Sequence, residues 1–135
     1  MGSEPLFATR TEWRNRVANV ALVGELDIAG VPILEQDLTP VERNGVASIV
    51  LDLRELTFLD GSAVHALVAA QQRAEANGHR LVVVGADQGS RRLFELTRTQ
   101  FLLDEGHAFD GLEQFTGDRT ARAGPGSFAD VQSDD

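Results

Sequence analysis

The sequence predicts an α/β fold in which a strand, a helix and a second strand follow one another. Residues 46–51, apart from Ser48, and residues 81–84 are apolar, as are strands that are covered on both faces. Between them lies a helical pattern that begins near Ala63 and ends at the stop signal Asn77-Gly78. Elements in this order form a right-handed crossover, so the two strands are expected to run parallel in one sheet.

The residues before this unit predict a hairpin and a first helix. Apolar and polar residues alternate from 7 to 23, and Arg14-Asn15-Arg16 is the turn between two short strands. Pro32 suits the first turn of a helix, and apolar residues recur behind it at helical spacing. We therefore expect a helix over 31–43, closed by the stop signal Asn44-Gly45.

A third helix is predicted after the second buried strand, over residues 90–97. Its inward-facing residues are expected to be Leu93, Phe94 and Leu96. The short apolar stretch 101–103 follows this helix.

The rest of the chain divides at Thr116. Before it, a last short helix or strand would use Phe109, Leu112 and Phe115. After it, the composition changes to Gly, Arg, Ala, Ser and Asp, with Phe128 as the single aromatic residue. The sequence therefore predicts one domain over 1–116 and a disordered acidic tail over 117–135.

Length, charge and cysteine content exclude several classes of protein. The 135 residues suffice for one hydrophobic core, and the absence of cysteine excludes thiol catalysis and a disulfide scaffold. Twelve basic and 21 acidic residues give a net charge of −9, which repels nucleic acids and anionic membranes. No apolar run approaches the roughly 20 residues of a membrane span, and residues 1–5 lack the features of an export signal. A cytoplasmic protein is therefore expected.

The first candidate site is the junction between strand and helix at residues 59–64. A helix N-terminus exposes unpaired N–H groups and the positive end of the helix dipole. Asp60 or Ser62 can cap those N–H groups, which by itself accounts for both residues. Alternatively, the Ser62 hydroxyl lies where an added phosphate would be stabilised. A structural role and a regulatory role are therefore both open for this serine.

A second candidate is the turn over residues 85–90, which lies between a buried strand and a helix. Nucleotide phosphates bind at such turns in many α/β folds. This turn has neither the Gly-x-Gly-x-x-Gly pattern nor the lysine of a P-loop. A tight turn capped by Asp87 or Ser90 is therefore favoured, and a nucleotide-sensing or lipid-sensing module is the alternative.

Catalytic and metal sites are not predicted. The spacing of a helical metal site is absent from the three histidines, His65, His79 and His107. A nucleophile built from Ser62, His65 and Asp60 is disfavoured because the Gly-x-Ser-x-Gly elbow is absent. No carboxylate pair stands out as acid and base. We therefore expect no enzymatic activity, no cofactor and no metal.

Three motifs stand in a fixed order along the chain. They are Gly24-Glu25-Leu26-Asp27, then Ile49-Val50-Leu51-Asp52-Leu53 leading to Phe58-Leu59-Asp60-x-Ser62, and finally Arg91-Arg92-Leu93-Phe94-Glu95-Leu96. In this order and spacing they resemble the STAS domain of the bacterial anti-sigma factor antagonists, over about residues 7–115. The resemblance implies a mixed sheet of four to five strands with helices packed mainly on one face, in agreement with the elements above.

The resemblance also implies a regulator that acts by partner switching. The dephosphorylated protein would bind an anti-sigma factor of the histidine-kinase-like ATPase fold, displace a sigma factor and so permit transcription. The anti-sigma factor would phosphorylate the antagonist on serine or threonine, and a separate serine phosphatase would reset it. Neither nucleic acid nor membrane is expected as a partner. Since no predicted helix carries a second apolar face, a monomer is expected when the protein is free.

The site of the family carries over onto this chain with one departure. Asp27 matches the acidic end of the Gly-Glu-Leu-Asp motif, and Asp60 matches the Asp of Asp-Ser-Ser/Thr-Gly-Leu. The usual phosphoacceptor directly follows that Asp, where this chain has Gly61, and Ser62 matches the next position. The residues expected to bind the partner are Asp27, Asp60, Gly61, Ser62, Ala63 and Val64, with Ser62 as the candidate phosphoacceptor.

The glycine at position 61 leaves two alternatives for Ser62. If the helix begins one residue later, the flexibility of Gly61 lets Ser62 reach the acceptor position, because glycine tolerates backbone angles that serine resists. Otherwise Ser62 faces away from the kinase, because consecutive helical residues point about 100° apart. The protein would then be an antagonist that always binds, or a module switched by something else. Ser62 as acceptor is the alternative that we prefer.

Overall fold

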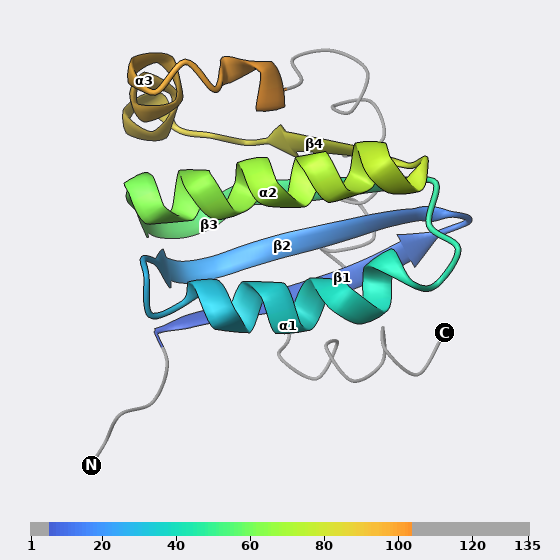
Figure 1. Cartoon of the computed structure of the whole chain (residues 1–135). Helices are drawn as coiled ribbons and strands as arrows, with labels where there is room; N and C mark the ends of the chain where they lie inside the picture. The colour runs from blue at the N-terminus through green and yellow to red at the C-terminus, as the bar shows by residue number, and fades with distance from the viewer. Residues whose placement is uncertain (1–5, 104–135) are drawn as a thin grey trace.

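Four strands form one mixed sheet in the computed structural model, which describes residues 6–103 (Figure 1). They are β1 (Phe7–Arg14), β2 (Val17–Leu26), β3 (Ser48–Leu59) and β4 (Arg80–Val84), and they lie side by side in chain order. β1 and β2 are antiparallel, whereas β2, β3 and β4 run parallel. The predicted hairpin and the predicted parallel crossover are both confirmed.

Two helices connect the parallel strands, and their ends lie at the residues that the sequence signals mark. α1 (Val31–Glu42) has Pro32 in its first turn and leads from β2 to β3. α2 (Gly61–Asn77) leads from β3 to β4 and ends at Gly78, whose φ of 81° is left-handed. The turn of the hairpin contains Asn15 with a φ of 58°, a conformation that asparagine tolerates better than most residues.

α1 and α2 lie on the same face of the sheet and bury the main core (Figure 1). Leu34 and Leu38 of α1 and Leu67 of α2 are completely buried in this core, together with Ile49 and Leu51 of β3. Complete burial of such a side chain stabilises the fold by about 1.5–3 kcal/mol. This layer therefore holds the ends of β2 and β3, from which the candidate site projects.

A third helix, α3 (Gln88–Leu96), and a short 3₁₀ helix, η1 (Gln100–Leu102), lie beyond β4 (Figure 1). Phe94 is buried in the main core, as predicted, and Leu102 of η1 is buried there as well. Leu96 is 69% exposed, so the expectation that it faces inward was wrong. Two helical steps turn a side chain by about 200°, so with Phe94 inward Leu96 must face outward.

β3 is longer than the run 46–51 that predicted it, because it continues to Leu59. Its pairing with β4 ends at Asp52 and Val84, whereas its pairing with β2 continues to Leu26 and Leu59. The outer half of β3 therefore has neighbours mainly on one side, and its polar residues are compatible with this position. A strand of this kind does not show the apolar pattern of a central strand.

Several sequence expectations fall outside the described residues. They concern the element at Phe109, Leu112 and Phe115 and the tail over 117–135, together with the domain boundary between them. Within residues 6–103, no helix has both the length and the hydropathy that are needed to cross a membrane.

Candidate functional site

The carboxyl ends of β2 and β3 meet at one edge of the sheet and bring the candidate residues together. Leu26 and Leu59, the last residues of these strands, are paired with each other. Asp27 follows the first strand, and Asp60 and Ser62 follow the second. The β2–α1 loop and the start of α2 thus leave the sheet at the same edge, on the left in Figure 1.

Asp60 is the N-cap of α2, so the capping interpretation is confirmed for this residue. Its Oδ1 accepts a hydrogen bond from the backbone N–H of Ala63 at 3.1 Å. The same oxygen accepts a second hydrogen bond from the Ser62 hydroxyl at 2.6 Å. The Ser62 hydrogen bond is the main cause that lowers the pKa of Asp60 below its ordinary value of 3.8, and the N–H of Ala63 also lowers it. A carboxylate therefore stands beside the serine oxygen at neutral pH.

Ser62 is partly exposed, and Asp60 fixes its orientation. A hydroxyl has one proton to donate, and here that proton points at Asp60. It is therefore not shared with His65, and the catalytic nucleophile that the sequence disfavoured receives no support. The oxygen of Ser62 remains at the N-terminal end of α2, where the helix dipole stabilises added negative charge.

Gly61 is the first residue of α2, and its backbone does not use the conformational freedom of glycine. Among residues 6–103, the glycines with a positive φ do not include Gly61. A Cβ added to Gly61 would meet no atom of the described part within 4 Å. A side chain is therefore compatible with this position. The helix begins at Gly61 rather than one residue later, so the orientation of Ser62 comes from its hydrogen bond to Asp60 and not from the flexibility of Gly61.

Asp27 closes the β2–α1 loop through local hydrogen bonds. Its Oδ1 accepts from the backbone N–H of Ala29 at 3.0 Å, and its carbonyl oxygen accepts from that of Gly30 at 2.9 Å. Such a turn fixes the direction of the carboxylate. The pairing of Leu26 with Leu59 places the turn at Asp27 near the start of α2.

Ala63 and Val64 do not lie on the surface. Both are buried in the main core, below the start of α2. Their side chains are not available to a partner, so the expected binding surface is corrected by removing these two residues. Packing requires small or apolar residues at these two positions, because the first turn of α2 must cover the sheet.

Three exposed apolar residues lie on the strand ends and the loop that carry the acidic groups, and the sequence analysis did not identify them as site residues. Ile28 is 75% exposed, Leu6 is 67% exposed and Phe58 is 50% exposed. Glu25 connects two of them, since its backbone N–H donates to Leu6 and its Cα pairs with that of Phe58. Large apolar side chains that gather on a surface are a common sign of a protein-binding site. We call the surface formed by Leu6, Glu25, Asp27, Ile28, Phe58, Asp60, Gly61 and Ser62 the loop edge.

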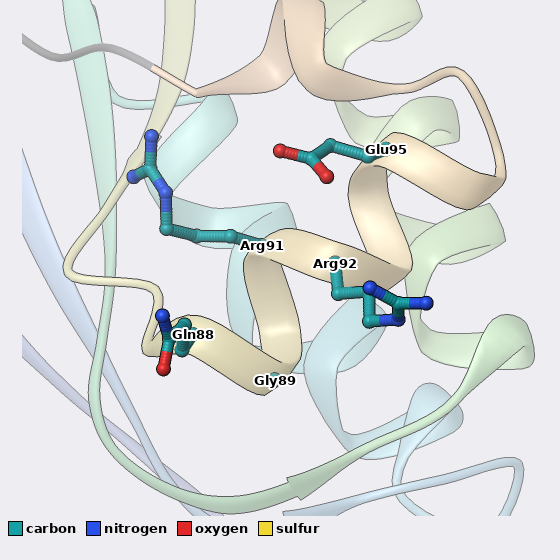
Figure 2. A pocket seen from close by; sticks show the side chains of 5 residues that line it. All are labelled: Gln88, Gly89, Arg91, Arg92 and Glu95. Atoms are coloured by element: carbon teal, nitrogen blue, oxygen red, sulfur yellow. The ribbon is translucent and has the colours of Figure 1, made fainter.

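The turn over residues 85–90 has the structural role that the sequence favours. Asp87 caps α3 by accepting a hydrogen bond from the N–H of Ser90 at 2.8 Å. A cavity of about 520 Å³ lies along α3, and the residues that line it are Gln88, Gly89, Arg91, Arg92 and Glu95. Figure 2 shows the guanidinium groups of Arg91 and Arg92 pointing in different directions. They therefore do not converge on one anionic ligand.

The histidines form no metal site in the described residues, where no group of three metal-ligating side chains occurs. His65 is exposed on α2 and His79 is buried before β4. His107 lies outside the described part of the chain.

The loop edge has the composition of a protein-binding surface. Comparison with known families identifies the domain. The family model described as "Mlab, STAS domain" matches residues 9–104, which is most of the chain. The chain therefore belongs to the STAS domain family, and the fold predicted from the resemblance is confirmed.

Individual relatives of this chain have names that are more specific than that of the family. An anti-sigma-B factor antagonist of Staphylococcus aureus (strain NCTC 8325 / PS 47) is 29% identical over 103 residues, which are 76% of this chain and 93% of the relative. The crystal structure of an anti-sigma factor antagonist from Mycobacterium paratuberculosis is similar with a TM-score of 0.68 and 25% identity, over 80% of this chain and 92% of that chain.

The fold is also that of the anti-sigma factor antagonist SpoIIAA. Its unphosphorylated form has a TM-score of 0.67 and 20% identity, over 82% of this chain and 97% of that chain. The phosphorylated form of SpoIIAA from Bacillus has a TM-score of 0.62 and 19% identity, over 80% of this chain and 99% of that chain.

Removing the cap of α2 is expected to lower stability. Asp60→Ala should reduce the free energy of unfolding by about 1 kcal/mol, because the N–H of Ala63 loses its partner. Asp87→Ala, which removes the cap of α3, is the matched control. Urea denaturation measures both losses.

The effect of Asp60→Ala should depend on pH. Since the pKa of Asp60 is lowered in the folded protein, its contribution is present above the unfolded value of 3.8 and is lost as the pH falls through the lower folded value. The difference in the free energy of unfolding between wild type and Asp60→Ala should therefore shrink as the pH falls through the folded pKa of Asp60. A difference that stays constant down to the lowest pH would show that the carboxylate form is not what caps the helix.

Proposed function

We propose that this STAS domain is a cytoplasmic anti-sigma factor antagonist. It binds an anti-sigma factor of the histidine-kinase-like ATPase fold and so releases a sigma factor, without catalysis of its own. The observation that carries the proposal is the loop edge, where apolar and acidic side chains are exposed around the capped start of α2. The relatives that are named anti-sigma factor antagonists support the same role.

The chemistry of the loop edge indicates what the partner surface must contain. Leu6, Ile28 and Phe58 need apolar contacts to be removed from water. Glu25 and Asp27 lie in the same strand end and loop, and their negative charges favour arginine or lysine on the partner. The anti-sigma factor should therefore present an apolar area with basic residues at its rim.

Phosphorylation of Ser62 would switch this surface off. The kinase transfers the γ-phosphoryl group of ATP to the Ser62 oxygen: the bond between the γ-phosphorus and the bridging oxygen breaks, ADP leaves, and the hydroxyl proton is released. The phosphoserine can no longer donate to Asp60, so the 2.6 Å hydrogen bond is replaced by repulsion between a phosphate and a carboxylate. Although the helix dipole tolerates the added charge, the loop edge then carries two more negative charges in its centre. A serine phosphatase restores the binding form.

The test is an affinity capture from the native cells with mass spectrometry. Wild type should retain an ATPase of the histidine-kinase-like fold, and Ser62→Asp should retain at least about tenfold less of it. The interface would bury an added carboxylate next to that of Asp60 without a countercharge of its own, which costs several kcal/mol. Ser90→Asp, at the start of α3, is the control for an acidic residue at another helix start. Incubation of the captured pair with ATP should place phosphate on Ser62.

The outcomes separate the two parts of the proposal. Equal retention by wild type and Ser62→Asp would leave the antagonist in place and remove Ser62 as its switch. In that case Ser62→Ala combined with Gly61→Ser tests the neighbouring position, since a side chain at 61 meets no described atom within 4 Å. If wild type retains no such ATPase, the antagonist role is wrong and the nucleotide-sensing or lipid-sensing module becomes the better description.

A further inference from the structure

The dipeptide Asn-Gly occurs twice in this chain, each time at the end of a helix that covers the sheet. Asn44-Gly45 lies in the turn after α1, and Asn77-Gly78 ends α2. All four residues are exposed, and the φ angles of the two glycines are 70° and 81°. A Cβ at either glycine would meet no described atom within 4 Å. The two copies are therefore matched in sequence, in the backbone of the glycine and in their open surroundings.

The two copies differ in what holds the N–H of the glycine. The N–H of Gly78 donates to two carbonyl oxygens of the last turn of α2, so it belongs to the closed end of that helix. α1 already ends at Glu42, and no acceptor within residues 6–103 takes the N–H of Gly45. The backbone nitrogen of Gly45 can therefore approach the side chain of Asn44, whereas the nitrogen of Gly78 is held in place.

We propose that Asn44 is a site of spontaneous deamidation, and that the fold protects Asn77 from the same reaction. The backbone nitrogen of Gly45 gives up its proton and attacks Cγ of Asn44, and the new C–N bond closes a succinimide ring. The bond between Cγ and the side-chain nitrogen breaks, and this nitrogen leaves with the proton as ammonia. Water then opens the ring at one of its two carbonyl carbons, so the products are aspartate and isoaspartate.

The remaining asparagines of the chain are less suited to this reaction. Glycine has no Cβ to shield the attacking nitrogen, and its backbone adopts the widest range of angles. Asn15 precedes Arg16 and Asn19 precedes Val20, so a side chain shields the nitrogen at both positions. Asn19 is also only 1% exposed within β2. Among the four asparagines, all of which lie within residues 6–103, Asn44 thus combines a glycine neighbour with an unheld nitrogen.

The turn that contains Asn44 is tied to the hairpin of β1 and β2. The carbonyl oxygen of Gly45 accepts a hydrogen bond from Nε of Arg16 at 2.9 Å, and that of Arg16 accepts one from the N–H of Ala47 at 2.7 Å. Isoaspartate adds a carbon atom to the main chain, which displaces Gly45 from Arg16. β3 begins beside this contact, at Ser48, and the loop edge lies at its other end. Deamidation should therefore lower Tm and leave the loop edge unaltered.

The experiment follows the deamidation of the full-length protein over time in a mildly alkaline buffer, by mass spectrometry of its peptides. In the folded protein, Asn44 should react at least about tenfold faster than Asn77, because Asn77 reacts only after the hydrogen bonds of Gly78 have broken. In concentrated urea the two rates should become similar, since both dipeptides are then unfolded. Incubated wild type should lose Tm, whereas incubated Asn44→Gln should keep it, because its longer side chain cannot close the same ring.

Each result supports or overturns the proposal. Equal rates at Asn44 and Asn77 in the folded protein, or a faster rate at Asn77, would overturn it. So would a rate difference that persists in urea, because the flanking sequence and not the fold would then set it. A loss of Tm that incubated Asn44→Gln shares with wild type would refute the loosening of the hairpin by this modification. None of these results depends on the partner proposed for the loop edge.

Discussion

Replacing Phe58 and Ile28 together by serine is expected to weaken the binding of the ATPase partner by at least about 100-fold. Both side chains are at least half exposed, so they contribute little to the core. At an interface, aromatic and large apolar anchors each contribute about 2 kcal/mol or more when they become desolvated. The captured ATPase, titrated against each purified variant by calorimetry, measures the change.

The matched control for this pair is Leu96→Ser with Phe101→Ser. These side chains are 69% and 61% exposed, but they lie on α3 and η1, away from the loop edge. Their replacement should leave the affinity unchanged, and both double variants should keep the Tm of wild type within a few degrees. If both pairs weaken binding equally, or neither does, the apolar residues of the loop edge are not the anchors. The antagonist role itself would survive that result.

Gly24→Ala is expected to reduce the free energy of unfolding by about 3–4 kcal/mol. The φ of Gly24 is 97°, which L side chains rarely adopt. A Cβ at this position would also overlap the carbonyl oxygen of Leu6, which is backbone and cannot rotate away. That oxygen accepts the hydrogen bond from Glu25 at 2.8 Å, so the variant should also loosen the start of β1 against the end of β2.

Gly78→Ala measures how much a left-handed backbone alone costs in free energy of unfolding, without a steric overlap. The φ of Gly78 is 81°, but a Cβ there would meet no described atom within 4 Å. Its expected cost is therefore only about 1–2 kcal/mol, from the left-handed conformation alone. Urea denaturation of both variants gives the comparison. Equal losses would mean that the Leu6 carbonyl moves aside at little cost, and that the backbone conformation explains both values.

The parts of the fold that depend on local signals could be predicted from the sequence. Asn77-Gly78 ends α2 through a left-handed residue, and Asp60 begins it through its side chain. Both effects act within a few residues. The outer half of β3 was not predicted, because strand formation there depends on pairing with β2 over a long separation in sequence. Local pattern does not contain that information.

The candidate site also contains residues that could be predicted from the sequence and residues that could not. Asp27, Asp60 and Ser62 follow from motifs in the sequence and lie together in the structure. The exposure of Phe58 and Ile28 could not be predicted, because an apolar residue gives no sign of which side it faces until its neighbours are known. Ala63 and Val64 belong to the same motif, but their role is to pack in the core. Their burial, which the sequence does not show, reveals this role.

The overhang of β2 and β3 beyond the last pair of β4 has a consequence for the dynamics of the loop edge. Past Asp52 and Val84, these two strands are paired with each other and no longer with β4. A segment with few neighbours can open locally at a free energy well below that of global unfolding. The strand ends at the loop edge can therefore be reshaped on contact with another protein while Ile49, Leu51 and the helices above them stay folded.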